Sequence, residues 1–291
     1  MKLKGIFVGL STIDIIYRVS ESPAPNRKIA AQSQEIFVGG PATNAAITFA
    51  FLGGSAKLVT PAGRHPLASL IKEECEHFGI ELIDLVPDSQ EAPPVSSIWV
   101  DAEGQRSVVS ANANGRVIPA AIVDPSRMAG VNIVLVDGHP MQACQAWADA
   151  ASSADTCVVM DGGSWKPGTD QLLRSVDVAI CSADFSPPGC TDERDVVSYL
   201  RSAGVTKFAI THDAAPIHFA TQSMSGMIQV PEVEAVDTTG ARDIFHGAFC
   251  FYYASGCEFE QAIRKAAIIA AESCRYQGTR TWMDAMRNPD R

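Results

Sequence analysis

The 291-residue chain lacks the features typical of disulfide-rich, zinc-stapled and membrane-spanning proteins. Its eight cysteines include no CxxC pair and most lie in apolar runs, which predicts reduced, buried thiols in a cytoplasmic protein. No uninterrupted apolar stretch approaches the ~18 residues that a transmembrane helix requires, so we expect no membrane partner. The chain also has no internal repeat and no low-complexity segment.

Positive charge is scarce as well, with 23 Lys and Arg residues against 33 Asp and Glu residues and a net charge of -10. This balance argues against nucleic acid or an anionic membrane surface as the main partner. It does not exclude ATP, because a local anion site and a metal ion determine whether a nucleotide binds. The hydrophobic content of 46% is ordinary for a soluble globular protein.

Short apolar runs alternate with helix-length segments, a pattern typical of a parallel sheet with helices on both faces. We predict strands at 6–10, 56–60, 133–137, 157–161, 178–182 and 208–211. We predict helices near 42–52, 66–78, 141–152, 168–175, 193–203, 242–255 and 258–275. The length allows one large α/β domain or two small ones.

Small and polar residues follow several predicted strands: Asp137-Gly138, Asp161-Gly162-Gly163, Ser182-Ala183-Asp184 and Thr211-His212-Asp213. Because ligands of open α/β sheets bind at the carboxyl ends of strands, we expect these residues to line the site. Two segments, 12–38 and 93–112, have the character of extended strands instead. We expect them to form a small antiparallel β-sheet lid that keeps water from the reaction. The alternative is a surface hairpin without a catalytic role.

The most informative motif is Asp237-Thr238-Thr239-Gly240-Ala241-Arg242-Asp243, which follows a strand-like run at 227–233 and precedes an apolar helical stretch. A short Gly/Ala turn at a helix start directs free backbone N–H groups and the positive helix dipole at one point, so it can bind an anion. A carboxylate beside such a site, Asp243, is suited to phosphoryl transfer onto a hydroxyl. The alternative is an Asp that only caps the helix.

A second motif, Gly39-Gly40-Pro41-Ala42-Thr43-Asn44, opens an earlier predicted helix. Paired glycines allow a ligand to approach the backbone closely. Asn44 offers donors and an acceptor that suit a sugar hydroxyl. A tight turn explains the same residues equally well.

Together and in this order, the two motifs resemble those of the ribokinase-type (pfkB) carbohydrate kinase family, and the resemblance spans essentially the whole chain. It includes Asp14, the two lid segments and Gly278-Thr279-Arg280. It implies a single ribokinase-like domain over 1–291: an α/β, Rossmann-like three-layer sandwich with a small β-sheet lid. Several family members dimerise through the lid, and here Ile98 and Trp99 are candidates for a homodimer contact or for packing on the core.

The resemblance also implies roles for individual residues. Asp243 matches the catalytic base, and Gly240, Ala241 and Arg242 match the anion-hole positions. Sugar-binding positions are matched by Asp14, Gly39, Gly40 and Asn44. The implied cofactors are ATP and Mg²⁺, with K⁺ in many members, held by carbonyls near the late motif such as those of Asp237 and Thr239. The implied nucleotide contacts are Ser182, Asp184, Thr211, Asp213, Thr238 and Gly240.

Three departures from the family pattern raise a second hypothesis. Arg242 replaces a glycine, Asp213 and Pro216 stand in glycine positions beside the nucleotide, and Asp184 stands where a Glu-containing element is expected. The Arg242 side chain either adds a cation for the phosphates, blocks them, or strains the backbone. The chain is therefore either an active kinase or a weak or inactive kinase-fold protein that binds a sugar or a nucleotide.

The substrate is predicted less directly. Lys28 resembles a lysine that contacts the sulfonate in sulfofructose kinases, but His139 stands near the place of an expected arginine. Asn112 and Asn114 either contact sugar hydroxyls or form a turn. A neutral ketose such as fructose is the first prediction, ribose the second, and a sulfo- or phospho-ketose the third. His246 lies in no HxxxH motif and near no Cys/His cluster, so we expect it to be structural and expect no tightly bound transition metal.

Overall fold

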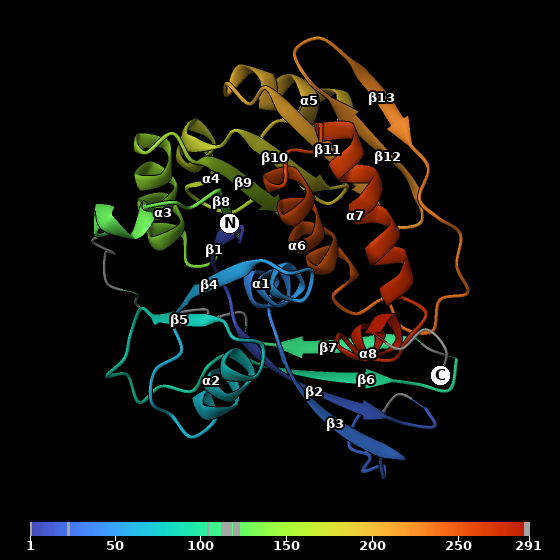
Figure 1. Ribbon diagram of the computed structural model, residues 1–291. Coiled ribbons are helices and arrows are strands. Elements are labelled where there is room, and N and C mark those ends of the chain that lie inside the picture. The colour runs from blue at the N-terminus through green and yellow to red at the C-terminus, as the bar shows by residue number, and fades with distance from the viewer. Residues whose placement is uncertain (1, 22–23, 104, 112–117, 119–122, 288–291) are drawn as a thin grey trace.

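Seven parallel strands form most of a nine-stranded sheet in the computed structural model, which describes residues 2–21, 24–103, 105–111, 118 and 123–287. The sheet order is β13-β12-β11-β10-β9-β8-β1-β4-β5, and only the pairs that involve β12 are antiparallel (Figure 1). The strands are β1 (Lys4–Val8), β4 (Ser55–Thr60), β5 (Glu81–Asp84), β8 (Ile133–Val136), β9 (Cys157–Gly162), β10 (Val178–Ser182), β11 (Lys207–His212), β12 (Ala215–Ala220) and β13 (Ser225–Ile228).

Helices cover both faces of this sheet, as the alternating pattern predicts. They are α1 (Pro41–Phe51), α2 (Ala68–His77), α3 (Met141–Ser153), α4 (Thr169–Leu172), α5 (Glu193–Ser202), α6 (Ala241–Ala254), α7 (Phe259–Ser273) and α8 (Thr281–Arg287), with 3-10 turns at Pro125–Met128 and Leu173–Ser175. In β1, Phe7 packs in the core beneath α1, α6 and α7, whereas Ile6 and Val8 pack in the core beneath α3. The fold is thus the predicted three-layer α/β sandwich.

A separate four-stranded sheet forms the predicted lid, in the order β3-β2-β6-β7. Its strands are β2 (Thr12–Arg18), β3 (Ser33–Gly39), β6 (Val95–Val100) and β7 (Arg106–Ser110). The prediction of an antiparallel lid is wrong at its centre, because β2 and β6 pair in parallel, with Ile16 opposite Ile98. The chain passes through β4, α2 and β5 between them, and a connection of that length permits parallel pairing.

The strand-like run predicted at 227–233 is also shorter than expected, because β13 ends at Ile228. Pro231 has no backbone N–H and cannot continue a ladder, which explains why no strand follows. The sequence reasoning did not anticipate β5, β12 or α8. None of the helices in the described part of the chain combines the length and the apolar character that a bilayer crossing requires.

The apolar side chains of the lid differ in how far they are exposed to solvent. Ile98 is 7% exposed and packs within the protomer, so it is unsuited to a contact between protomers. Ile36 and Val109, in register across the sheet through Ile15 and Ser97, are 53% and 60% exposed. A homodimer through the lid stays a prediction, and this face is the one that would carry it.

Candidate active site

The late motif forms a tight turn that starts α6. Gly240 caps the helix with φ of 69°, and a Cβ there would lie 2.7 Å from Thr279 Cγ2, so the turn requires glycine. The Asp237 carboxylate holds the turn by accepting hydrogen bonds from Thr239 N at 2.9 Å and Gly278 N at 3.0 Å. Ala241 N donates a long bond of 3.3 Å to Thr238 O. The first turn of α6 therefore has the polarity of an anion site.

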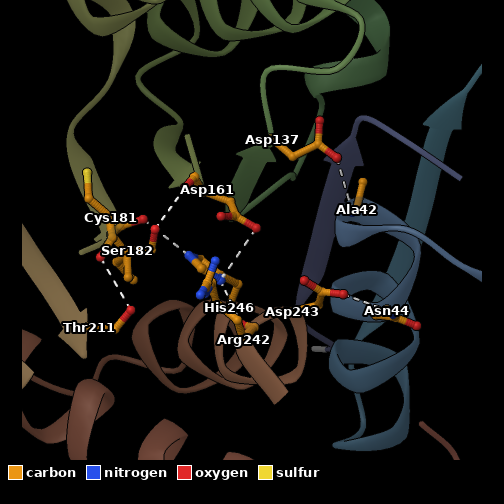
Figure 2. A network of polar contacts seen from close by, with 12 residues as sticks. Ala42, Asn44, Asp137, Asp161, Cys181, Ser182, Thr211, Arg242, Asp243 and His246 are labelled. Carbon is orange, nitrogen blue, oxygen red and sulfur yellow. Dashed lines mark hydrogen bonds and ion pairs between the residues drawn. The ribbon is translucent and has the colours of Figure 1, made fainter. Parts of the chain in front are cut away.

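The early motif starts α1 in a similar way. Gly40 has φ of 98°, and a Cβ there would lie 2.3 Å from Leu10 O. One turn later, Asn44 Nδ2 donates to Asp243 Oδ2 at 2.7 Å, across 199 residues of sequence. Figure 2 shows these two side chains pointing toward each other from α1 and α6. The two motifs, recognised separately in the sequence, thus form one site.

Arg280 joins this site, and the sequence reasoning assigned it no role. Its Nη1 donates to Asn44 Oδ1 at 2.9 Å, its Nη2 to Val38 O at 2.9 Å, and its Nε to Glu74 Oε1 at 2.8 Å. The orientation of Asn44 is fixed at both ends, by Arg280 at its oxygen and by Asp243 at its nitrogen. The sequence pointed to Arg280 only through the Gly278-Thr279-Arg280 segment, which is part of the family resemblance.

Three carboxyl groups lie around the N-termini of α1 and α6. Burial, and to a smaller extent Asp161, raises the pKa of Asp243 to about 6, against the opposing effects of Asn44, His246 and Arg242. Burial raises the pKa of Asp137 to about 7, although Leu10 N and His139 N donate to it at 2.8 and 2.7 Å. Asp243 is thus mostly ionised at neutral pH but a stronger base than an exposed carboxylate, which suits proton abstraction.

His246 proves to be a buried structural residue, as expected. Its side chain is 1% exposed, with Nδ1 2.7 Å from Arg242 O and Nε2 3.3 Å from Ile180 O. Nδ1 also lies 3.6 Å from Asp161 Oδ2. A dashed line in Figure 2 marks this contact between His246 and Asp161. His246 therefore links the first turn of α6 to the ends of β9 and β10, and so helps to position Asp243.

The Arg242 side chain points toward the loop that follows β11. Its Nη2 lies 3.8 Å from Asp213 Oδ1, and its side chain is 38% exposed. Among the described residues other than glycine, positive φ occurs only at Asn26, Asp155 and Asp213, so Arg242 carries no such strain. Asp213, with φ of 51°, keeps the left-handed backbone that a glycine position would have, and its carboxylate faces a cation rather than standing alone.

The sugar-binding candidates divide into two groups. Asp14 and Gly39 lie together, because a Cβ on Gly39 would be 2.0 Å from Asp14 Oδ2, and burial raises the pKa of Asp14. Lys28 is exposed in the loop between β2 and β3. Asn112 and Asn114 lie outside the described residues. The structure therefore brings Asp14, Gly39, Gly40 and Asn44 together near Asp243 and Arg280, whereas the Lys28 side chain is exposed to solvent.

The charged state of the basic residues near the carboxyl ends of β8 and β9 determines whether the site could bind an anionic sugar. Burial, with a smaller effect of Lys166, lowers the pKa of His139 to about 4, so this residue is neutral at physiological pH rather than partly charged. Lys166 Nζ lies 3.5 Å from Asp137 O and 3.3 Å from Ser164 O. Lys166, which the sequence reasoning missed, is thus the cation next to this strand end.

The nucleotide-binding candidates lie at the ends of β10 and β11. Ser182 Oγ donates to Gly163 O at 2.7 Å and accepts from Asp184 N at 3.1 Å, so Ser182 orders the loop that carries the exposed Asp184. Thr211 Oγ1 donates to Cys181 O at 3.3 Å. Thr238 is exposed at the start of the late turn. Pro216 lies in β12, where its carbonyl is 3.2 Å from His212 Nδ1.

Comparisons with known proteins agree with this geometry. A family model described as pfkB family carbohydrate kinase matches residues 3–286. A ribokinase of Staphylococcus aureus is 25% identical over 261 residues, which cover 86% of each chain. A deoxyribokinase of Salmonella typhi is 23% identical, covering 94% of this chain and 93% of the relative. The solved structure of Arabidopsis thaliana ribokinase complexed with ribose and ATP superposes with a TM-score of 0.79 at 23% identity, covering 96% of this chain and 94% of that chain.

Proposed function

The chain belongs to the pfkB family of carbohydrate kinases, and on that premise we propose that it transfers the γ-phosphoryl group of ATP to a hydroxyl of a small sugar, with Asp243 as the base. One observation carries the proposal. A partly buried carboxylate in the first turn of α6, that of Asp243, is held 2.7 Å from Asn44, next to the backbone N–H groups of a glycine turn.

In the proposed reaction, the sugar oxygen forms a bond to the γ-phosphorus while the bond from that phosphorus to the β,γ-bridging oxygen breaks. Asp243 takes the proton of the sugar hydroxyl. The N–H groups at the start of α6 stabilise the charge on the phosphoryl oxygens. Arg242, released from its long contact with Asp213, adds a cation to the same anion site.

The residues present fit the cofactors that the family implies. Asp184, exposed at the end of β10, would order water bound to a Mg²⁺ ion that accompanies ATP. The Asp237 and Thr239 carbonyls belong to a turn held by the Asp237 carboxylate, and such oxygen donors suit a monovalent cation such as K⁺. Bound Mg²⁺ would neutralise the crowded phosphate charge. The lid would exclude water from the reacting groups.

For the sugar, a neutral pentose such as ribose or deoxyribose is our first proposal, because ribokinases and a deoxyribokinase are among the relatives. Fructose is the second. An anionic ketose has weaker support, because Lys28 is exposed, His139 is neutral and the Arg280 guanidinium pairs with Glu74. Lys166 is the cation that would have to serve such a substrate.

A panel of sugars tests the proposal. With ATP, Mg²⁺ and K⁺, we expect ATP-dependent phosphorylation of one neutral sugar among ribose, deoxyribose and fructose. Thermal shift with each sugar and a nonhydrolysable ATP analogue identifies ligands independently of turnover, because binding raises apparent stability by mass action. Stabilisation by a sugar without turnover would contradict the kinase proposal and support the alternative of a kinase-fold binding protein.

A further inference from the structure

Two histidines and one glutamate meet where α5 begins beside β11 and β12. They are Glu193, the first residue of α5, His212, at the end of β11, and His218, in β12. Glu193 Oε2 lies 2.8 Å from His212 Nε2, and Glu193 Oε1 lies 2.6 Å from His218 Nδ1. The three potential ligand atoms all lie within 4.8 Å of one another.

The hydrogen bonds of His212 determine which of its nitrogens can bind a cation. His212 Nδ1 lies 3.2 Å from Pro216 O, and a carbonyl can only accept, so Nδ1 carries the hydrogen. In a neutral ring, Nε2 then presents its lone pair to the Glu193 carboxylate. A cation between the two would relieve this repulsion. A ring that donates one N–H to a backbone carbonyl is the usual arrangement of a metal-binding histidine.

The cluster is also accessible. The side chains of Glu193, His212 and His218 are 34%, 24% and 43% exposed. Two hollows meet at Glu193, one lined by His218 and Phe219 and the other by Ser182 and His212. An ion can therefore reach the ligand atoms without any rearrangement of the core.

We propose that Glu193, His212 and His218 form a binding site for a divalent transition metal such as Zn²⁺. Two imidazole nitrogens and one carboxylate oxygen are a ligand set that suits Zn²⁺, with a fourth position left for water. Mg²⁺ prefers oxygen ligands and is not selected here. Tetrahedral ligands about 2.0–2.1 Å from one Zn²⁺ stand about 3.3 Å apart. The Glu193 oxygens, now 2.8 and 2.6 Å from the ring nitrogens of His212 and His218, would move outward by roughly 0.5–0.7 Å. The three ligand atoms, which lie within 4.8 Å of one another, would adjust to the same spacing.

The proposed site differs from the expectation that no transition metal binds, which rested on the sequence alone. Its three residues come from three elements and have no metal-ligand spacing in the sequence. It also has a consequence for the kinase site. A bound metal would tie the start of α5 to the β11–β12 hairpin, and the turn of that hairpin carries Asp213, which faces Arg242. Metal occupancy would thus fix the loop beside the nucleotide candidates.

Metal titration of the full, chelator-treated protein tests the site. We expect one Zn²⁺ per chain by equilibrium dialysis, a rise in Tm with Zn²⁺, and at least a roughly 10-fold weaker affinity in His212→Ala, His218→Ala and the near-isosteric Glu193→Gln. His77→Ala, which removes an exposed histidine on α2, should bind as the wild type does.

Cobalt substitution separates this site from the free cysteines. A complex with only nitrogen and oxygen ligands lacks the intense near-ultraviolet absorption of cobalt–thiolate bonds, and we expect that absorption to be absent. Strong cobalt–thiolate bands, unchanged affinity in all three ligand variants, or no binding of Zn²⁺ to the wild type would each overturn the proposal.

Discussion

The Asp243→Asn variant is expected to have a kcat lower than that of the wild type by roughly 10²–10⁴-fold, the usual contribution of a positioned general base. Asparagine has nearly the shape of aspartate. At position 243, in the first turn of α6, its side-chain oxygen can still accept the hydrogen bond from Asn44 Nδ2 in α1, so the fold should persist. What is lost is the group that takes the proton of the sugar hydroxyl. Steady-state kinetics at saturating ATP and sugar measure the effect, once the sugar panel has identified a substrate.

Two controls make this test specific. Asp88→Asn removes a carboxylate whose side chain is 93% exposed, and its kcat should not change. Binding of a nonhydrolysable ATP analogue to Asp243→Asn should also be retained. If Asp243→Asn keeps a kcat within a few-fold of the wild type, then Asp243 is not the base.

The pH dependence provides an independent measurement of the same carboxylate. Burial raises the pKa of Asp243 to about 6, and only the ionised form can accept a proton. The wild-type kcat/KM is therefore expected to be level above about pH 6 and to fall roughly tenfold per unit below it. The residual activity of Asp243→Asn should lack this acid limb. A limb that persists in the variant would belong to another group.

The parts of the fold that follow from local pattern were predictable from the sequence. Buried parallel strands are continuous apolar runs, so strands such as β8 and β10 were predicted to within a residue. The antiparallel strands β12 and β13 at one edge of the sheet were not predictable. Pro216 stands near the start of β12, and β13 has only four residues, which is too short to show a hydrophobic period. The parallel pairing of β2 with β6 depends on the path of the chain between them, which no local pattern records.

In the candidate site, too, residues in local motifs were predictable from the sequence, and contacts between distant segments were not. Gly240, Asp243 and Asn44 stand in short motifs whose turn chemistry is local, and these could be predicted. The contact of Arg280 with Asn44 spans 236 residues, and the cluster of Glu193, His212 and His218 joins three elements. Such contacts depend on tertiary placement. Likewise, the neutral state of His139 follows from burial, which a sequence alone does not give.

Arg280→Met is expected to lower both stability and kcat, because the Arg280 guanidinium donates to four acceptors and methionine has no donor. The Arg280 and Glu74 side chains are 17% and 24% exposed, so Glu74 would lose a mostly buried partner. Removing one partner of such a pair costs about 3 kcal/mol, and thermal denaturation should show a Tm lower by several degrees. Asn44 would also lose its support, and a misplaced site residue can reduce kcat by up to roughly 10²-fold.

A second variant separates the positioning role of Arg280 from its structural role. Glu74→Gln weakens the ion pair but leaves the hydrogen bond from Arg280 Nη1 to Asn44 Oδ1, which is 2.9 Å long. We expect Glu74→Gln to lower the Tm while it keeps kcat within a few-fold of the wild type. Arg280→Lys keeps the charge but not the planar guanidinium, so it should satisfy only some of the four acceptors. Its kcat should lie between those of Glu74→Gln and Arg280→Met. Equal losses of kcat in Glu74→Gln and Arg280→Met, measured below both Tm values, would mean that Arg280 acts only through stability and does not position Asn44.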